Sequence, residues 1–108
     1  IYVMGLSMGG YGTWDAIQRR PYFFAAAVPI CGGGDKSMGK LLTKIPIWSW
    51  HGDQDQVINV MRSRDMDTAI RKSGGSPKYT EVQGRGHDVW LDVWDSDDLW
   101  EWLYSQSK

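Results

Sequence analysis

The sequence predicts an α/β fold in which about four parallel strands form a sheet with flanking helices. Short apolar runs that end at glycine, typical of buried parallel strands, alternate along the chain with segments whose apolar residues recur at helical spacing. A length of 108 residues allows one domain at most. Right-handed crossovers join such alternating segments into a parallel sheet.

Four segments have the composition of strands: residues 1–4, 25–31, 45–50 and 78–82. The first is the apolar run Ile-Tyr-Val-Met, which Gly5 ends. Pro29 lacks an N–H and weakens a central strand, so we expect the regular part of the second strand to stop near Val28.

Three segments are predicted helices: residues 11–20, residues 57–73 and a last helix that follows Ser96. Pro21 ends the first helix. Ser96 is a good N-cap for the last helix, and the carboxylates of Asp97 and Asp98 complement the helix dipole in its first turn. We interpret residues 35–44 as a polar connection without an assigned local structure.

Charge and hydropathy exclude several classes of partner. The chain carries 12 Lys and Arg against 13 Asp and Glu, with no basic run, so we expect neither nucleic acid nor an anionic membrane surface to bind. No apolar run approaches the ~20 residues that span a bilayer. The single cysteine, Cys31, cannot form an intramolecular disulfide, so cysteine usage does not distinguish between compartments.

A G-x-S-x-G motif, Gly5-Leu6-Ser7-Met8-Gly9, lies between the first predicted strand and the first predicted helix. In this context the motif indicates a nucleophile elbow, in which a serine occupies a sharp and strained turn. We expect the residues two before and two after Ser7 to be glycine because bulk would keep the two arms apart. The helix N-terminus behind Ser7 places N–H groups where an oxyanion would form.

A serine hydroxyl needs a base, and the chain offers His51 and His87. In folds with such an elbow the chain order is nucleophile, acid, histidine. His87 follows the fourth predicted strand in a glycine-flanked loop and fits this order. We interpret His51 as a loop histidine that is hydrogen-bonded to backbone.

The acid that orients the base should follow the third predicted strand, where Asp53 and Asp55 are both candidates. A calcium loop would need a further oxygen ligand and a glycine at its sixth position, which is Ile58, so we expect no metal there. Asp88 is better explained as a surface or capping residue of the histidine loop.

These segments together resemble a known family. They are Tyr2 to Trp14, Phe24 to Gly33, the His51-Gly52-x-x-Asp55-x-Val57 pattern, the Gly86-His87-x-x-Trp90 pattern and Leu99 to Leu103. The chain resembles the C-terminal half of α/β-hydrolase serine esterases. The nearest group is the bacterial predicted peptidases and the carboxylesterases similar to polyhydroxybutyrate depolymerases and feruloyl esterases.

The resemblance implies a function and residue roles. Ser7 would be the nucleophile, Asp55 the acid and His87 the base of a serine carboxylesterase, with the backbone N–H of Met8 in the oxyanion hole. The substrate would be a small-molecule ester and no cofactor would be needed. Peptidases and thioesterases use the same machinery. Activity should rise with pH as His87 loses its proton.

Family members carry a further N-terminal half, whose strands neighbour the first strand seen here and whose loop supplies the second oxyanion donor. We therefore expect either a partial domain, residues 1–108, of a longer protein or a chain that forms a homodimer through the exposed edge of residues 1–4. The alternative to an enzyme is a non-catalytic fragment or assembly subunit that works beside an N-terminal half.

The tryptophans and the cysteine can be explained by structural roles as well as by functional ones. Five tryptophans are expected in the core or on formerly buried surface: Trp14, Trp48, Trp50, Trp100 and Trp102. Trp90 and Trp94 follow His87, so either could line a substrate subsite, and Trp90 could equally pack the histidine loop. Cys31 is expected to be a small buried hydrophobe.

Overall fold

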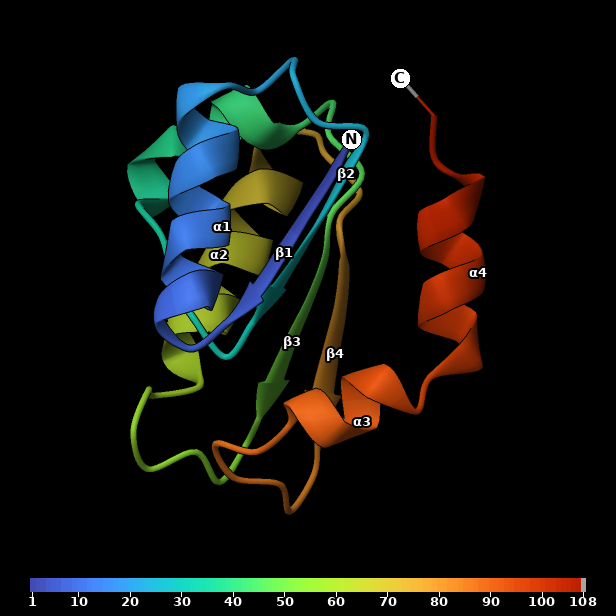
Figure 1. Cartoon of the computed structure of the whole chain (residues 1–108). Helices are drawn as coiled ribbons and strands as arrows, with labels where there is room; N and C mark the ends of the chain where they lie inside the picture. The colour runs from blue at the N-terminus through green and yellow to red at the C-terminus, as the bar shows by residue number, and fades with distance from the viewer. Residues whose placement is uncertain (108) are drawn as a thin grey trace.

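Four parallel strands form one sheet in chain order, β1-β2-β3-β4 (Figure 1). The computed structural model describes residues 1–107. Its elements are β1 (Tyr2–Leu6), α1 (Met8–Arg19), β2 (Ala26–Ile30), the 3₁₀ helix η1 (Lys36–Leu42), β3 (Trp48–Gly52), α2 (Met61–Lys72), β4 (Lys78–Val82), α3 (Trp90–Trp94) and α4 (Asp97–Ser105). The predicted α/β fold with four parallel strands is confirmed.

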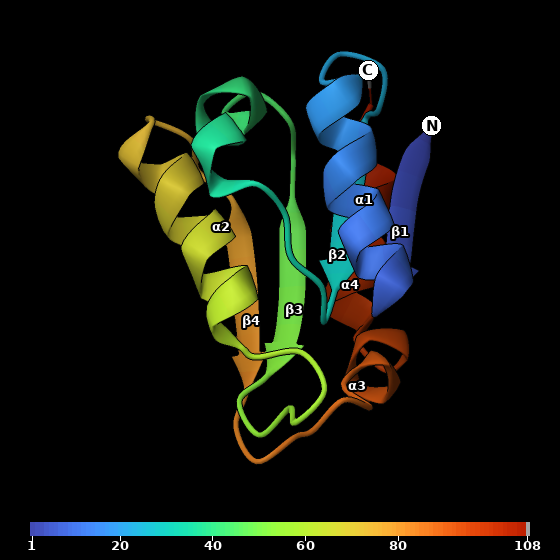
Figure 2. The same cartoon turned by 90° about the vertical axis from the view of Figure 1, so that its left-hand side faces the viewer.

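Helices cover both faces of the sheet. Because the strands follow one another in one direction, right-handed crossovers place α1, η1 and α2 on the same face, as Figure 2 shows. The C-terminal segment carries α3 and α4 to the opposite face. Each face has its own apolar core. One is centred on Trp14, Ile17, Ile47, Met66 and Ile70, and the other on Val28, Ile30, Trp50, Val93 and Leu99.

Several elements match the sequence prediction closely. The fourth strand spans residues 78–82 as expected, and the last helix begins after Ser96, whose hydroxyl accepts a hydrogen bond of 3.2 Å from the N–H of Leu99. The third strand is shifted, since it begins at Trp48 and continues through His51 and Gly52. In the segment before it, Ile47 forms an isolated bridge to Ala27 of β2, and its carbonyl accepts a hydrogen bond of 2.8 Å from the N–H of Lys78.

Pro29 contradicts the expected end of the second strand. It lies inside β2 and pairs in register with Gly5 of β1. The N–H groups of Ala27 and Cys31 donate to the β3 side, so by alternation the missing donor of Pro29 also faces β3. There the β2–β3 ladder is reduced to the pair Ile30 and Trp50. The proline therefore weakens one ladder without ending the strand.

The helix boundaries differ from the prediction for local reasons. α1 begins at Met8, directly after the turn at Ser7, and not at residue 11. α2 begins at Met61 and not at residue 57, because the Asp55 side chain binds the backbone of the intervening loop. The polar connection contains η1, whose start is capped by Asp35. The short helix α3 was not predicted.

The five tryptophans expected in the core all contact it, but they differ in how deeply they are buried. Trp14, Trp48 and Trp50 are buried, whereas Trp100 and Trp102 of α4 are partly buried and pack against the core. Cys31 is fully buried, as predicted. Within residues 1–107, no helix combines the length and apolar character needed to cross a bilayer.

Candidate active site

Ser7 occupies a strained turn between β1 and α1. Its backbone angles are φ 56° and ψ −115°, a region that non-glycine residues rarely adopt. The strain is held from both sides: the Ser7 N–H donates to the carbonyl of Ile30 at 2.9 Å, and its own carbonyl accepts from Gly10 and Tyr11 of α1. The turn directs the side chain beyond the carboxyl end of the sheet. The expected backbone strain at this serine is therefore present.

The two glycines of the motif, Gly5 and Gly9, differ in whether the structure leaves room for a side chain. A Cβ on Gly5 would collide with the backbone of Gly9, so Gly5 is required for the two arms to meet. A Cβ on Gly9 would meet nothing within 4 Å, which contradicts the expectation for that position. The other close approach is between Gly10 and Gly32, where α1 starts against the end of β2.

Asp55 lies in the loop after β3 and its side chain is fully buried. Its Oδ1 accepts hydrogen bonds of 2.8 Å from the N–H groups of Val57 and Ile58. Burial raises the pKa of this carboxyl, but hydrogen bonds from His87 and from these two N–H groups outweigh burial and lower it overall. Asp55 is thus held as a carboxylate in one orientation.

The neighbouring Asp53 has a different task. Its Oδ1 accepts a hydrogen bond of 2.7 Å from the N–H of Gly84, which ties the loop after β3 to the loop after β4. Of the two candidates that the sequence left open, Asp55 is the one beside a histidine. Asp88 contacts Arg85 at 3.7 Å, in agreement with its expected surface role.

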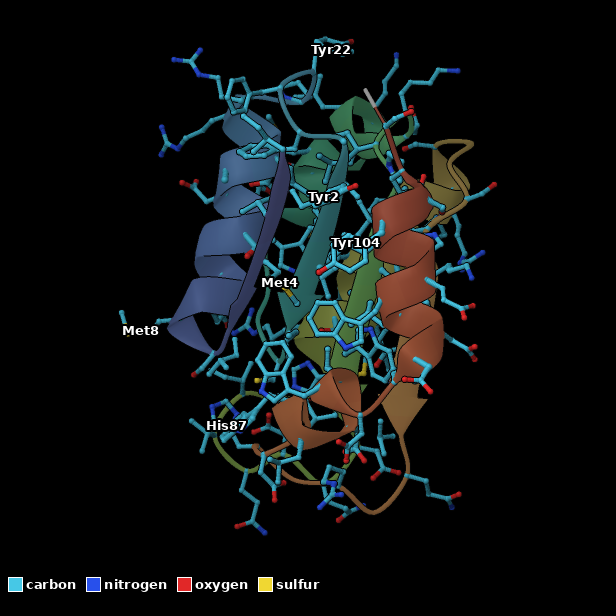
Figure 3. All side chains as sticks on the ribbon, turned by 45° about the vertical axis from the view of Figure 1, so that its right-hand side comes forward. Tyr2, Met4, Met8, Tyr22, His87 and Tyr104 are labelled. Atoms are coloured by element: carbon cyan, nitrogen blue, oxygen red, sulfur yellow. The ribbon has the colours of Figure 1, made fainter. Side chains whose placement is uncertain are left out.

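His87 reaches the site because the loop after β4 crosses over the end of β3. The carbonyl of Arg85 accepts a hydrogen bond of 3.0 Å from the N–H of Gln54. A Cβ on Gly52 would collide with the carbonyl oxygens of Arg85 and Gly86, so only glycine allows this crossing. Figure 3 shows His87 beyond the carboxyl end of the sheet, near α3.

The three predicted side chains form one hydrogen-bonded line. Nε2 of His87 lies 2.8 Å from Oγ of Ser7, and Nδ1 of His87 lies 2.7 Å from Oδ2 of Asp55. Because a carboxylate only accepts, Nδ1 carries the proton and Nε2 is left to accept from the serine hydroxyl. This is the arrangement that general-base activation of a serine requires.

Met8 is the first residue of α1. Its side chain is 86% exposed and points away from the body of the molecule in Figure 3. Its backbone N–H opens the helix beside Ser7, where no earlier turn of the helix can bond it. This position agrees with the oxyanion-hole role expected for Met8, which remains a prediction.

Comparison with solved structures shows the fold. The chain matches the crystal structure of a thermostable esterase with a TM-score of 0.97 and 42% identity, over 100% of this chain and 31% of the esterase. The chain has the fold of the C-terminal half of an α/β-hydrolase. The acylaminoacyl peptidase of Pyrococcus horikoshii shares the fold at a TM-score of 0.76 and 16% identity, over 85% of this chain and 20% of the peptidase.

Sequence comparison is less informative. No family model matches the chain. An uncharacterized secreted protein of Arthroderma benhamiae is 27% identical over 115 aligned positions, which cover 79% of this chain and 12% of that protein. The chain spans less than a third of the length of the thermostable esterase and about an eighth of the length of the secreted protein.

Trp90 packs beside His87 in the candidate site. Its ring is perpendicular to the His87 imidazole, at 89° with centroids 6.2 Å apart, and it also contacts the core on that face. These contacts favour the interpretation that Trp90 packs the histidine loop, while a substrate-binding role for it remains a prediction. Trp94 instead stacks on Trp100.

Cys31 and His51 lie close to the site, and the sequence did not predict either residue there. Ligand atoms of Cys31, Asp55 and His87 lie within 4.8 Å of one another, a set that could in principle hold a metal. However, burial raises the pKa of the Cys31 thiol to about 11, and Asp55 already accepts three hydrogen bonds. His51 lies buried in β3 and not in a loop, although it does bind backbone as expected, at the carbonyl of Ile58. The signal in the sequence that could have placed His51 near the site is its position four residues before Asp55.

Proposed function

We propose that Ser7, His87 and Asp55 hydrolyse carboxylic esters through an acyl-enzyme intermediate. The observation that carries the proposal is the continuous line of hydrogen bonds from Ser7 through His87 to Asp55, 2.8 Å and 2.7 Å long. The strained backbone of Ser7 and the 42% identity to a thermostable esterase support it. Small-molecule esters are the proposed substrates.

The geometry allows a balanced sequence of steps. Oγ of Ser7 attacks the acyl carbon while its proton passes to Nε2 of His87, and the N–H of Met8 stabilises the oxyanion. Collapse expels the alcohol, which takes the proton from His87. Water then adds to the acyl-enzyme as His87 accepts its proton. Collapse of this second intermediate breaks the bond to Oγ of Ser7, which takes the proton back from His87, and the carboxylic acid leaves. Asp55 keeps the imidazole in the working tautomer throughout.

The test is hydrolysis of p-nitrophenyl acetate by the 108-residue chain, compared with Ser7→Ala. We expect Ser7→Ala to lose at least about 10³-fold in kcat/KM, because the nucleophile is removed. Ser107→Ala, at an exposed serine, is the matched control and should keep the full rate. Mass spectrometry should also find a fluorophosphonate attached to Ser7 and not to Ser107.

Equal rates for the wild-type chain and Ser7→Ala would contradict the proposal. That outcome favours the second candidate, a non-catalytic chain that acts beside further strands. The observation in its favour is that β1 pairs only with β2 among the described residues, so its other edge is open. A single oxyanion donor would also lower the rate by ~10²- to 10³-fold.

A further inference from the structure

The imidazole of His51 lies beneath the candidate active site, at the carboxyl end of β3. Its side chain is fully buried. Nδ1 lies 2.7 Å from the hydroxyl of Ser63 on α2, and Nε2 lies 2.8 Å from the carbonyl oxygen of Ile58. The ring therefore joins a strand, a helix and the loop that carries Asp55.

These partners determine the tautomer of His51. A backbone carbonyl can only accept a hydrogen bond, so Nε2 carries the proton and donates to Ile58. Nδ1 is then the acceptor for the hydroxyl proton of Ser63. Burial lowers the pKa of His51, against the opposing effects of Ile58 and Asp55, which favours this neutral form. The side chain offers a single N–H, and the direction of that N–H is fixed.

The same ring nitrogen lies close to the carboxylate of Asp55. Nε2 of His51 lies 3.3 Å from Oδ2, the oxygen that accepts from Nδ1 of His87. The other oxygen is held by the N–H groups of Val57 and Ile58. His51 binds the carbonyl of Ile58, and the N–H of Ile58 in turn donates to Asp55. His51 therefore holds the short loop that orients the carboxylate and contacts its Oδ2.

We propose that His51 is a positioning residue for Asp55. Through its hydrogen bond to Ile58, its Nε2–H keeps the loop of residues 55–58 in place, and with it the carboxylate, so that Oδ2 faces His87. Ser63 keeps the His51 ring in the tautomer that can do this. The proposal rests on the proposed function, since positioning Asp55 has consequences only where His87 serves as a base.

The matched pair His51→Gln and His51→Asn separates positioning from packing. Both substitutions place a neutral amide in the same buried site. The amide nitrogen of glutamine can occupy the place of imidazole Nε2, whereas the shorter asparagine side chain reaches only the place of Nδ1. If His51 only fills space, any difference between the two variants in the site should be explained by their difference in thermal stability.

Two readouts are needed on the full chain. One is the proton resonance of His87 Nδ1–H, which lies far downfield when a carboxylate accepts it and which does not depend on turnover. The other is the rate constant for labelling of Ser7 by a fluorophosphonate. Thermal unfolding of each variant is measured alongside.

We expect His51→Gln to keep the downfield resonance and to label within about threefold of the wild-type chain. His51→Asn should lose the resonance and label about 10- to 100-fold more slowly, as expected when a catalytic group is displaced by a fraction of an ångström to an ångström. If the chain hydrolyses esters, His51→Asn should lower kcat and leave KM unchanged, because the substitution does not alter the contacts that bind the substrate in the ground state.

The proposal is overturned if His51→Asn keeps both the resonance and the labelling rate. It is equally overturned if both variants lose both readouts in proportion to a shared loss of thermal stability. Failure of the proposed function has a different signature: the wild-type chain would show the downfield resonance while Ser7 stays unlabelled. The resonance in the two variants then still decides whether His51 positions Asp55.

Discussion

Gly52 shows how a residue without a side chain shapes the candidate site. It ends β3 at the point where the loop after β4 crosses over it, and a Cβ there would overlap the carbonyl oxygens of Arg85 and Gly86. That loop carries His87 to Ser7, although the two residues lie 80 positions apart in the sequence. The space above Gly52 therefore controls the distance between the base and the nucleophile.

We predict that Gly52→Ala displaces His87 and slows fluorophosphonate labelling of Ser7 by at least about tenfold, because small shifts of a catalytic group are costly. Chemical unfolding should show a destabilisation of about 1–3 kcal/mol from the forced backbone shift. The matched control is Gly12→Ala in α1, where a Cβ meets nothing within 4 Å. It should leave labelling unchanged and stabilise the helix by about 0.5–1 kcal/mol. Similar behaviour of both variants would contradict the prediction.

Among the secondary-structure elements, α2 and β4 are joined by a charged pair on their exposed side. Nε and Nη2 of Arg64 donate to the two carboxylate oxygens of Glu81, each at 2.7 Å. The Tyr79 hydroxyl donates to the same carboxylate at 2.7 Å. The Arg64 hydrogen bonds lower the pKa of Glu81 to about 2, against burial, and the Tyr79 hydroxyl adds to the effect.

This pair predicts how stability depends on pH. The pKa of Glu81 is lower in the folded chain, about 2, than in the unfolded chain, about 4.3. Its contribution is therefore complete above about pH 4.3 and is lost as the pH falls towards 2. Between about pH 5 and pH 2 the free energy of unfolding should fall by roughly 1 kcal/mol more in the wild-type chain than in Glu81→Gln.

The measurement is urea unfolding across this pH range. Glu101→Gln, at an exposed position of α4, is the matched control and should follow the wild-type curve. A curve for Glu81→Gln that runs parallel to the wild-type curve would show that the pair contributes nothing measurable.

For the molecule overall, the outer edge of β1 is the feature that bears on assembly. Ile1 and Ser7 direct their backbone groups to the β2 side, so by alternation Tyr2, Met4 and Leu6 direct theirs outward. Tyr2 and Tyr104 lie together beside this edge in Figure 3, with ring centroids 6.1 Å apart. An open edge with apolar side chains favours pairing with another strand.

We predict that the 108-residue chain forms a two-fold dimer through β1 at micromolar concentration, with a continuous sheet. Light scattering should give twice the mass of 12.3 kDa. Met4→Pro removes an outward N–H and should favour the monomer, whereas Met4→Leu keeps that donor and should dimerise. A compact monomer of the wild-type chain would rule out the dimer.

Much of the site could be predicted because its residues follow strand ends. Ser7, Asp55 and His87 come after β1, β3 and β4, and parallel strands bring their carboxyl ends to one edge of the sheet. The part of His51 could not be predicted in this way. Its partners, Ser63 and Ile58, are set by how α2 docks against β3, which sequence spacing does not encode.

The sequence by itself determined the alternation of strands and helices, the cap at Ser96 and the motif at Ser7, because hydrophobic period, capping and turn chemistry are local properties. Packing decided the rest. The strand survives Pro29 because the missing donor faces β3, while the ladder between β1 and β2 stays complete. Asp55 is distinguished from Asp53 because its side chain binds His87, whereas that of Asp53 binds the backbone of Gly84. These outcomes depend on contacts between segments far apart in the chain, and only the folded backbone brings those segments together.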